Sequence, residues 1–157
     1  MRVTTTTALL LMLAAPIVSA QTSAASNAPM PPEVKWGPAP AVFPAGAQFA
    51  VLSGDPSGTG LFTVRLRFPD GYKVPSHTHP TDEHVTVVSG TLHVGMGAKF
   101  ETKGMMTLGP GGYVVAPANH AHYVRAQGVT VVQVHAMGPF AMTYVNPADT
   151  PRAGGSR

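Results

Sequence analysis

The regular alternation of apolar and polar residues is the feature that most constrains the fold of this chain. In the stretch LFTVRLRF, residues 61–68, Phe62, Val64, Leu66 and Phe68 alternate with polar residues. Residues two apart leave the same face of a strand, so this pattern predicts a half-buried β-strand. Further short β-branched runs follow, and 17 Gly and 16 Pro residues supply turns between them. No stretch after residue 20 has a helical period, and the sequence therefore predicts an all-β sandwich or barrel.

The first twenty residues, MRVTTTTALLLMLAAPIVSA, have the pattern of a signal peptide. Arg2 precedes an apolar run from Ala8 to Val18 that is too short to span a bilayer. Small residues stand at the −3 and −1 positions before Gln21. We therefore expect a signal peptide over residues 1–20, cleavage after Ala20, and export to the periplasm or the medium. The alternative is a retained amphipathic or membrane anchor.

The rest of the chain divides into three segments. Residues 21–44 are rich in Ala, Ser and Pro and are expected to be a flexible leader or arm. Trp36 and Phe43 either lie in an extended arm against the domain or a second subunit, or belong to a partly ordered tail with one aromatic tucked in. The folded domain is expected over 45–145, and residues 146–157 form a loose C-terminal tail.

Charge and cysteine content exclude several classes of function. Charged residues make up 11% of the chain, the net charge is +3, and the basic residues are scattered. This distribution does not fit a nucleic-acid binder, and no membrane association is expected after signal cleavage. The chain contains no Cys, so neither disulfides nor thiol chemistry are available. Stability must come from packing and from any metal that binds.

One short segment, GYKVPSHTHPTDEHVTVVSG, concentrates the residues that bind metals. His77 and His79 are two apart and share one face of a strand, and Glu83 follows four residues later. A further candidate comes from PANHAH, as His120 or His122. Imidazole and carboxylate groups that converge from separate strands are typical of a first-row transition-metal site.

The spacing of these residues resembles that of the cupin family. The first cupin motif, G-x5-H-x-H-x3-E-x6-G, is filled without insertion by Gly71, His77, His79, Glu83 and Gly90. The second motif, G-x5-P-x-G-x2-H-x3-N, is matched at Gly111, Pro117 and His122. In this second motif Asn119 stands where the family has its second glycine, a replacement that Asn tolerates because it visits the left-handed region, and Ala126 stands where the family has the final Asn.

The resemblance implies a fold and a ligand set. The implied fold is a small single-domain cupin, an all-β double-stranded β-helix of the jelly-roll class. The implied ligands are His77, His79, Glu83 and His122, which would hold one divalent transition metal ion with a coordination position open to substrate. The count from Pro117 selects His122 over His120. Fe, Mn, Cu, Zn and Ni all remain candidates, and a metal-free cupin that binds a ligand directly is the alternative.

Three further polar residues are candidates for catalytic roles. His120 either lines the mouth of the barrel as a proton shuttle or lies on the surface. Gln133 and His135 share one face of a strand. If that face points inward, the two form an acid–base pair near the metal; if it points outward, they are surface residues. His84 and His93 are expected to face away from the site.

These features predict an exported metal-dependent enzyme that acts on a small organic molecule. Dioxygenase-like oxidative cleavage is favoured, and isomerase or lyase chemistry comes next. The alternatives are a non-catalytic binding or sensing protein and a structural dimer stabilised by its metal. Because cupin-like subunits pair through edge strands, a homodimer is expected.

Overall fold

The computed structural model describes residues 33–151. The expected signal peptide, the first part of the expected leader and residues 152–157 lie outside the described residues and stay predictions. Within the described range, no helix is long and apolar enough to cross a bilayer.

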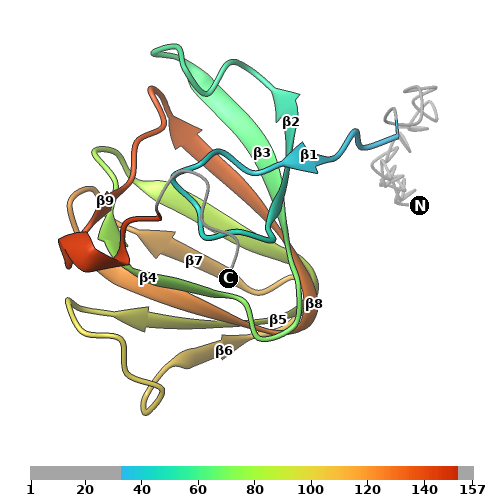
Figure 1. Cartoon of the computed structure of the whole chain (residues 1–157). Coiled ribbons are helices and arrows are strands. Elements are labelled where there is room, and N and C mark those ends of the chain that lie inside the picture. The colour runs from blue at the N-terminus through green and yellow to red at the C-terminus, as the bar shows by residue number, and fades with distance from the viewer. Residues whose placement is uncertain (1–32, 152–157) are drawn as a thin grey trace, which may run out of the picture. The chain divides into compact units, whose positions relative to one another are not determined.

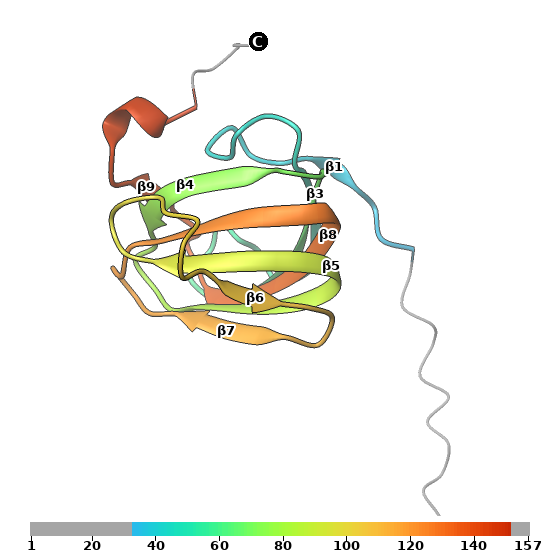
Figure 2. The same ribbon diagram turned by 90° about the horizontal axis from the view of Figure 1, so that it is seen from below.

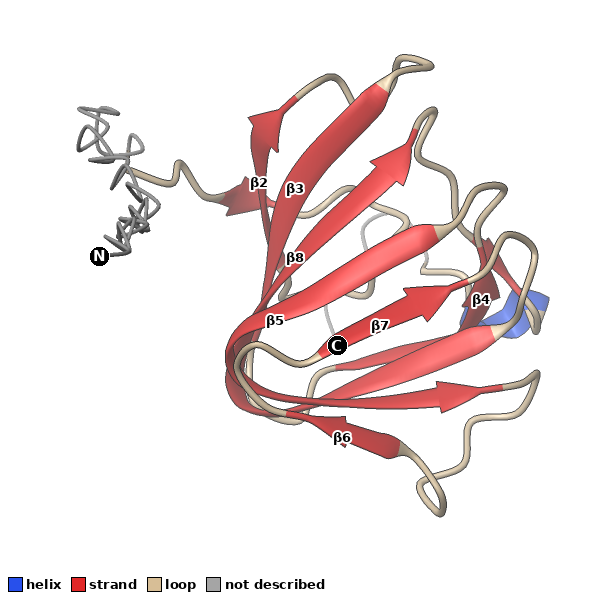
Figure 3. Cartoon of the chain, turned by 180° about the vertical axis from the view of Figure 1, so that it is seen from behind, coloured by secondary structure: helices blue, strands red, loops and turns tan. Residues whose placement is uncertain are grey.

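The described residues form strands almost throughout, together with one short 3₁₀ helix (Figures 1 and 3). The elements are β1 (Gly37–Pro38), β2 (Gln48–Ser53), β3 (Leu61–Phe68), β4 (Lys73–Thr78), β5 (Glu83–Met96), β6 (Met106–Leu108), β7 (Tyr113–Ala116), β8 (His122–Met137), β9 (Thr143–Tyr144) and η1 (Pro147–Asp149). The all-β prediction is confirmed.

Two long strands, β5 and β8, bend sharply and contribute one half each to two opposed layers (Figure 3). One layer has the order β2–β3–β8–β5–β7 and uses the second half of β8. The other has the order β6–β5–β8–β4–β9 and uses the first half of β8, with β4, β8, β5 and β6 side by side in Figure 2. All pairings are antiparallel, and the curled sheet is the predicted jelly-roll barrel.

The bend in β5 requires a glycine. The register between β5 and β8 shifts on both sides of Ser89, next to Gly90. Gly90 has a φ of +80°, and a Cβ atom there would lie 2.5 Å from the carbonyl oxygen of Val129. Any side chain would therefore meet the backbone of β8 as well as an unfavourable φ.

The predicted alternation places the core between the two layers. Phe62, Val64, Leu66 and Phe68 of β3 are all buried, whereas the polar residues between them are half-buried or exposed. β8 repeats the pattern, because Val132 and Val134 are buried beside them. The inner face of each strand therefore forms the apolar core that the sequence predicts.

The ordered body begins earlier than residue 45, where the sequence led us to place the domain boundary. β1 pairs with Gln48 and Phe49 of β2. Phe43 is only 5% exposed and belongs to the core cluster. The described part of this segment, residues 33–44, is therefore attached to the domain through β1 and Phe43. At the other end, the side chain of Asn146 accepts a hydrogen bond from the amide of Ala148 and caps η1, so the expected tail begins with an ordered turn.

The glycine at the bend leads to a prediction about stability. Gly90→Ala and Gly104→Ala both place a side chain at a φ near +80°, but nothing lies within 4 Å of a Cβ atom at Gly104. Both variants should lose about 1 kcal/mol from the unfavourable φ, and Gly90→Ala should lose roughly 1–3 kcal/mol more from the clash. Urea unfolding of the two variants measures the difference, and equal losses would contradict this account of the bend.

Candidate metal centre

Three buried imidazole rings meet at one end of the barrel. His77 lies on β4, His79 follows that strand, and His122 is the first residue of β8, directly opposite His77 in the register. One nitrogen from each ring lies within 4.8 Å of the others. Each residue is at most 5% exposed. The structure therefore brings together the three histidines that the motif selects.

Backbone carbonyls fix the orientation of all three rings. The Nδ1 atoms of His77, His79 and His122 lie 2.7, 2.7 and 3.2 Å from the carbonyl oxygens of Pro75, Ala141 and His120. A carbonyl oxygen only accepts hydrogen bonds, so each Nδ1 carries the proton and donates it. In a ring that carries this one proton, the lone pair is on Nε2, the atom left free to bind a metal.

Two of these Nε2 atoms have no hydrogen-bond partner. Among the described residues, the Nε2 atoms of His79 and His122 are the buried side-chain nitrogen or oxygen atoms that lack one. Buried polar atoms without partners are rare because each carries a desolvation penalty. Two unpartnered lone pairs in one cluster fit a bound cation.

Glu83 completes the set of predicted ligands. It is the first residue of β5, is 8% exposed, and its Oε2 lies 3.6 Å from Nε2 of His79 and 3.4 Å from Nε2 of His122. These distances are long for hydrogen bonds. Two ligands about 2.1 Å from one tetrahedral ion stand about 3.4 Å apart, so the spacing suits ligands that share an ion. The carboxylate lies near these two rings but does not belong to the group of three histidines whose nitrogens all lie within 4.8 Å of one another.

The electrostatics of the cluster favour the ligand forms of these groups. Burial, together with the neighbouring His122, lowers the pKa of His77 to about 3. Burial alone would raise the pKa of Glu83, but its interactions with the nearby rings of His122, His79 and His77 outweigh burial and lower that pKa. At neutral pH His77 is neutral and Glu83 is ionised, as metal binding requires.

Hydrogen bonds join the two loops that lie next to His79 and His122. The Oδ1 atom of Asp82 accepts a hydrogen bond of 2.7 Å from the amide of Ala118, and the amide of Asn119 donates one of 2.7 Å to the carbonyl of His79. Asn119 has a φ of +60°, the left-handed conformation expected where it replaces the motif glycine. The loop between β4 and β5 thus holds the loop that precedes His122.

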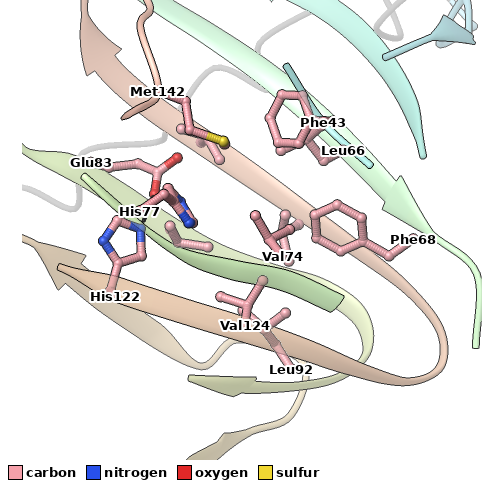
Figure 4. Close-up of a pocket in the computed structure, with 13 residues that line it drawn as sticks. Phe43, Leu66, Phe68, Val74, His77, Glu83, Leu92, His122, Val124 and Met142 are labelled. Atoms are coloured by element: carbon pink, nitrogen blue, oxygen red, sulfur yellow. Dashed lines mark ion pairs between the residues drawn. The ribbon is translucent and has the colours of Figure 1, made fainter. Parts of the chain in front are cut away.

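A cavity between the two layers opens onto the cluster (Figure 4). Its volume is about 30 Å³. His77, Glu83 and His122 lie together at one end, and Phe68 lies at the far end. The lining residues are Phe43, Leu66, Phe68, Val74, His77, Glu83, Val85, Leu92, His122, Val124, Val132, Val134 and Met142. Apart from His77, Glu83 and His122, every lining residue is apolar.

Gln133 and His135 face away from this cavity. Their neighbours Val132 and Val134 point inward and line it. On the outer face, Nδ1 of His135 is hydrogen-bonded to the Thr63 hydroxyl at 2.9 Å, and Nε2 of His135 is hydrogen-bonded to the Gln133 amide at 3.1 Å. The inward alternative, an acid–base pair at the metal, is therefore wrong, because strand alternation assigns the inner face to the valines.

The remaining histidines also lie outside the cavity. The side chain of His120 is exposed, and it is the carbonyl of His120 that contributes to the site, by accepting the bond from His122. A proton-shuttle role for the His120 side chain has no support in this geometry. His84 bonds to the Tyr113 hydroxyl, and His93 bonds to Thr107 and Gln127, both on the outer face as expected.

Several contributors to the site were not predicted. Phe43 and Met142 line the cavity, and the carbonyl of Ala141 orients His79. Phe140 packs on the His79 ring, with 5.3 Å between centroids. A carbonyl can be supplied by any residue type, so Ala141 leaves no signal in the sequence. The proline-flanked Phe43 carries a weak one, as an aromatic within a segment otherwise rich in small residues.

Residues 31–149 match the family described as a domain of unknown function, DUF4437. The chain belongs to this family. No curated protein sequence matches the chain. For this DUF4437 protein, the family match begins before residue 45 and includes the arm that carries Phe43.

Solved structures similar to this DUF4437 protein are jelly-roll proteins. A protein of Methylibium petroleiphilum PM1, provisionally assigned as an acetylacetone dioxygenase, is 24% identical, with a TM-score of 0.58 and coverage of 76% of this chain and 81% of that chain. A cupin 2 domain-containing protein of Halorhodospira halophila is 19% identical, with a TM-score of 0.55 and coverage of 66% and 73%. The polyketide cyclase RemF of Streptomyces resistomycificus is 17% identical, with a TM-score of 0.54 and coverage of 67% and 75%. At these identities the likeness establishes the cupin fold alone.

The buried, neutral His77 leads to a prediction about pH. Its pKa falls from 6.5 to about 3 on folding, so between these values the unfolded chain binds a proton that the folded chain does not. The free energy of unfolding of the metal-free protein should therefore decrease as the pH falls from 6.5 towards 3, by at most about 1.4 kcal/mol per pH unit from this group. Above pH 4.5, the ordinary pKa of a glutamate, the lowered pKa of Glu83 adds almost nothing.

Urea unfolding of the metal-free protein at pH 7 and pH 5 measures this decrease. In His77→Gln the decrease should be smaller, because the titrating group is gone. The same decrease in both proteins would show that another group is responsible.

Proposed function

We propose that the protein binds one divalent transition metal ion through His77, His79, Glu83 and His122, and that it is an enzyme acting on a small organic molecule. The observation that carries this proposal is the pair of buried, unpartnered imidazole nitrogens beside an ionised carboxylate. Three of the four ligands also line the cavity, so a molecule that enters it meets the site.

The chain's own residues prepare the site for chemistry. When bound, the ion supplies Lewis acidity or, if it is redox-active, activation of dioxygen. The carbonyls of Pro75, Ala141 and His120 hold the rings in place before any ligand arrives. The apolar wall excludes water and strengthens the electrostatic interactions at the polar end.

The cavity favours oxidative cleavage over isomerase or lyase chemistry. Proton-transfer reactions need an acid or base beside the substrate. Among the residues that line the cavity, the titratable groups are the proposed ligands themselves, and Gln133 and His135 point the other way. A dioxygenase-like reaction depends least on such groups. The structural neighbour assigned as an acetylacetone dioxygenase supports this order.

A non-catalytic role is the second candidate. A binding or sensing protein requires a pocket and no acid or base, and the apolar lining is compatible with that role too.

Export is proposed from residues 1–20 and homodimer formation from the exposed edge strands. In an exported compartment the affinity order of divalent metals favours copper and zinc.

Oxygen uptake separates the two candidates. Protein purified from its native compartment is first analysed for metals and then supplied with small diketones, phenols and carboxylates. An enzyme of the proposed class consumes oxygen with an apolar diketone or phenol. Metal at one ion per chain with no uptake on any of these substrates would favour the binding role.

The choice of His122 over His120 leads to a prediction about metal content. His122→Ala removes a buried ligand and should lose most bound metal and the stability that the metal provides. His120→Ala keeps the carbonyl that orients His122 and removes only an exposed side chain, so its metal content and Tm should match those of the native protein. Elemental analysis and thermal unfolding measure both properties, and equal effects would refute the ligand assignment.

A further inference from the structure

One wall of the metal-facing cavity is supplied by the segment that precedes the barrel strands. We call residues 37–47 the arm; it contains β1 and the turn that leads to β2. The amide of Ala39 donates a 3.1 Å hydrogen bond to the carbonyl of Ala47, which closes the arm into a loop. Within this loop Phe43 is buried and lines the cavity.

Two tyrosines are hydrogen-bonded to the backbone of the arm on either side of Phe43. The hydroxyl of Tyr144 donates a 2.8 Å hydrogen bond to the carbonyl of Val42, and the hydroxyl of Tyr72 donates one to the carbonyl of Pro44. Burial raises the pKa of both hydroxyls above the ordinary value of 10, so both stay protonated donors at neutral pH. The backbone on each side of Phe43 is therefore fixed to the barrel.

Aromatic packing fixes the ring of Phe43 itself. It stacks on Phe140 with 5.9 Å between centroids and 9° between ring planes. Phe140 in turn meets Phe62 edge to face. Figure 4 shows Phe43 beside Leu66, between Met142 and the apolar far end of the cavity. A ring held by stacking and by two backbone anchors forms a rigid wall.

The rest of the cavity restricts what else a ligand can carry. Arg65 bonds to Gln133 on the outer face, and Arg67 and Arg125 are exposed. None of these three is among the residues that line the cavity. A second charged or strongly polar group on the ligand would thus be buried without a partner, at a large cost in free energy.

We propose that Phe43 determines substrate specificity, and that the substrate is a small molecule with one metal-binding head and a short, uncharged apolar tail. The head lies at the histidine end and the tail lies against Phe43, Leu66 and Val74. This inference rests on the proposed function for the position of the head. The length of the tail is set by Phe43.

The first test measures tail length with straight-chain alkyl hydroxamates, from acetohydroxamate to octanohydroxamate, on the zinc-loaded protein. Calorimetry should show native affinity rising about fourfold with each added methylene group until the cavity is full, and then no further. In Phe43→Ala this limit should move to longer chains. Phe49→Ala is the matched control, since Phe49 packs against the core outside the cavity lining and should keep the native limit.

The second test needs no metal. Truncation of Phe43 enlarges an apolar space, and apolar cavities created in this way take up benzene. Metal-free Phe43→Ala should bind benzene, detected as a rise in Tm, and native protein and Phe49→Ala should not. If Phe43→Ala fails to fold, Phe43→Leu serves in both tests, with a smaller shift in the same direction.

The outcomes separate the two proposals. The same chain-length limit in native protein and Phe43→Ala would overturn the role of Phe43, and so would zinc-loaded native protein that binds no hydroxamate. Native protein that takes up no zinc would overturn the proposed function. In that case the benzene test alone decides the role of Phe43. If metal-free Phe43→Ala binds no benzene, that role is overturned.

Discussion

The candidate metal centre depends on hydrogen bonds from three buried imidazole rings to backbone carbonyls. Each bond places a proton on Nδ1 and leaves Nε2 bare. Because the rings are buried and the carbonyls belong to the backbone, the rings are oriented by the fold and need no ion to hold them in place. This arrangement leaves the Nε2 atoms of His79 and His122 buried without a hydrogen-bond partner, which is unfavourable. An ion bound between these atoms and Glu83 would relieve that penalty.

The barrel brings this arrangement about by folding two long strands over. The ligands come from the end of β4, the start of β5 and the start of β8, and the bends in β5 and β8 set these ends side by side. The same bends create the apolar space behind the ligands, because each strand gives its inner face to both layers. Site and cavity therefore follow from one feature of the topology, at a corner that Gly90 permits.

Much of this could be predicted from the sequence, and the limits have physical reasons. Alternation predicted the strands and their buried faces, and motif spacing selected His122 over His120. Spacing alone left the face of Gln133 and His135 open, since residues two apart share a face whichever way it points. The burial of Val132 and Val134 decides it. The position of Phe43 depends on hydrogen bonds from the hydroxyls of Tyr72 and Tyr144 to the backbone beside it. Such long-range contacts leave no local pattern in the sequence.

The contact between His79 and Ala141 spans 62 residues of sequence. Until the segment before β9 has docked, His79 has no carbonyl to fix its tautomer, and its ring lacks the neighbouring Phe140. During synthesis, which begins at the N-terminus, His77 and His79 are made well before Ala141, whose carbonyl orients the His79 ring. An ion bound as we propose would therefore be captured at the end of folding, in the compartment where folding is completed.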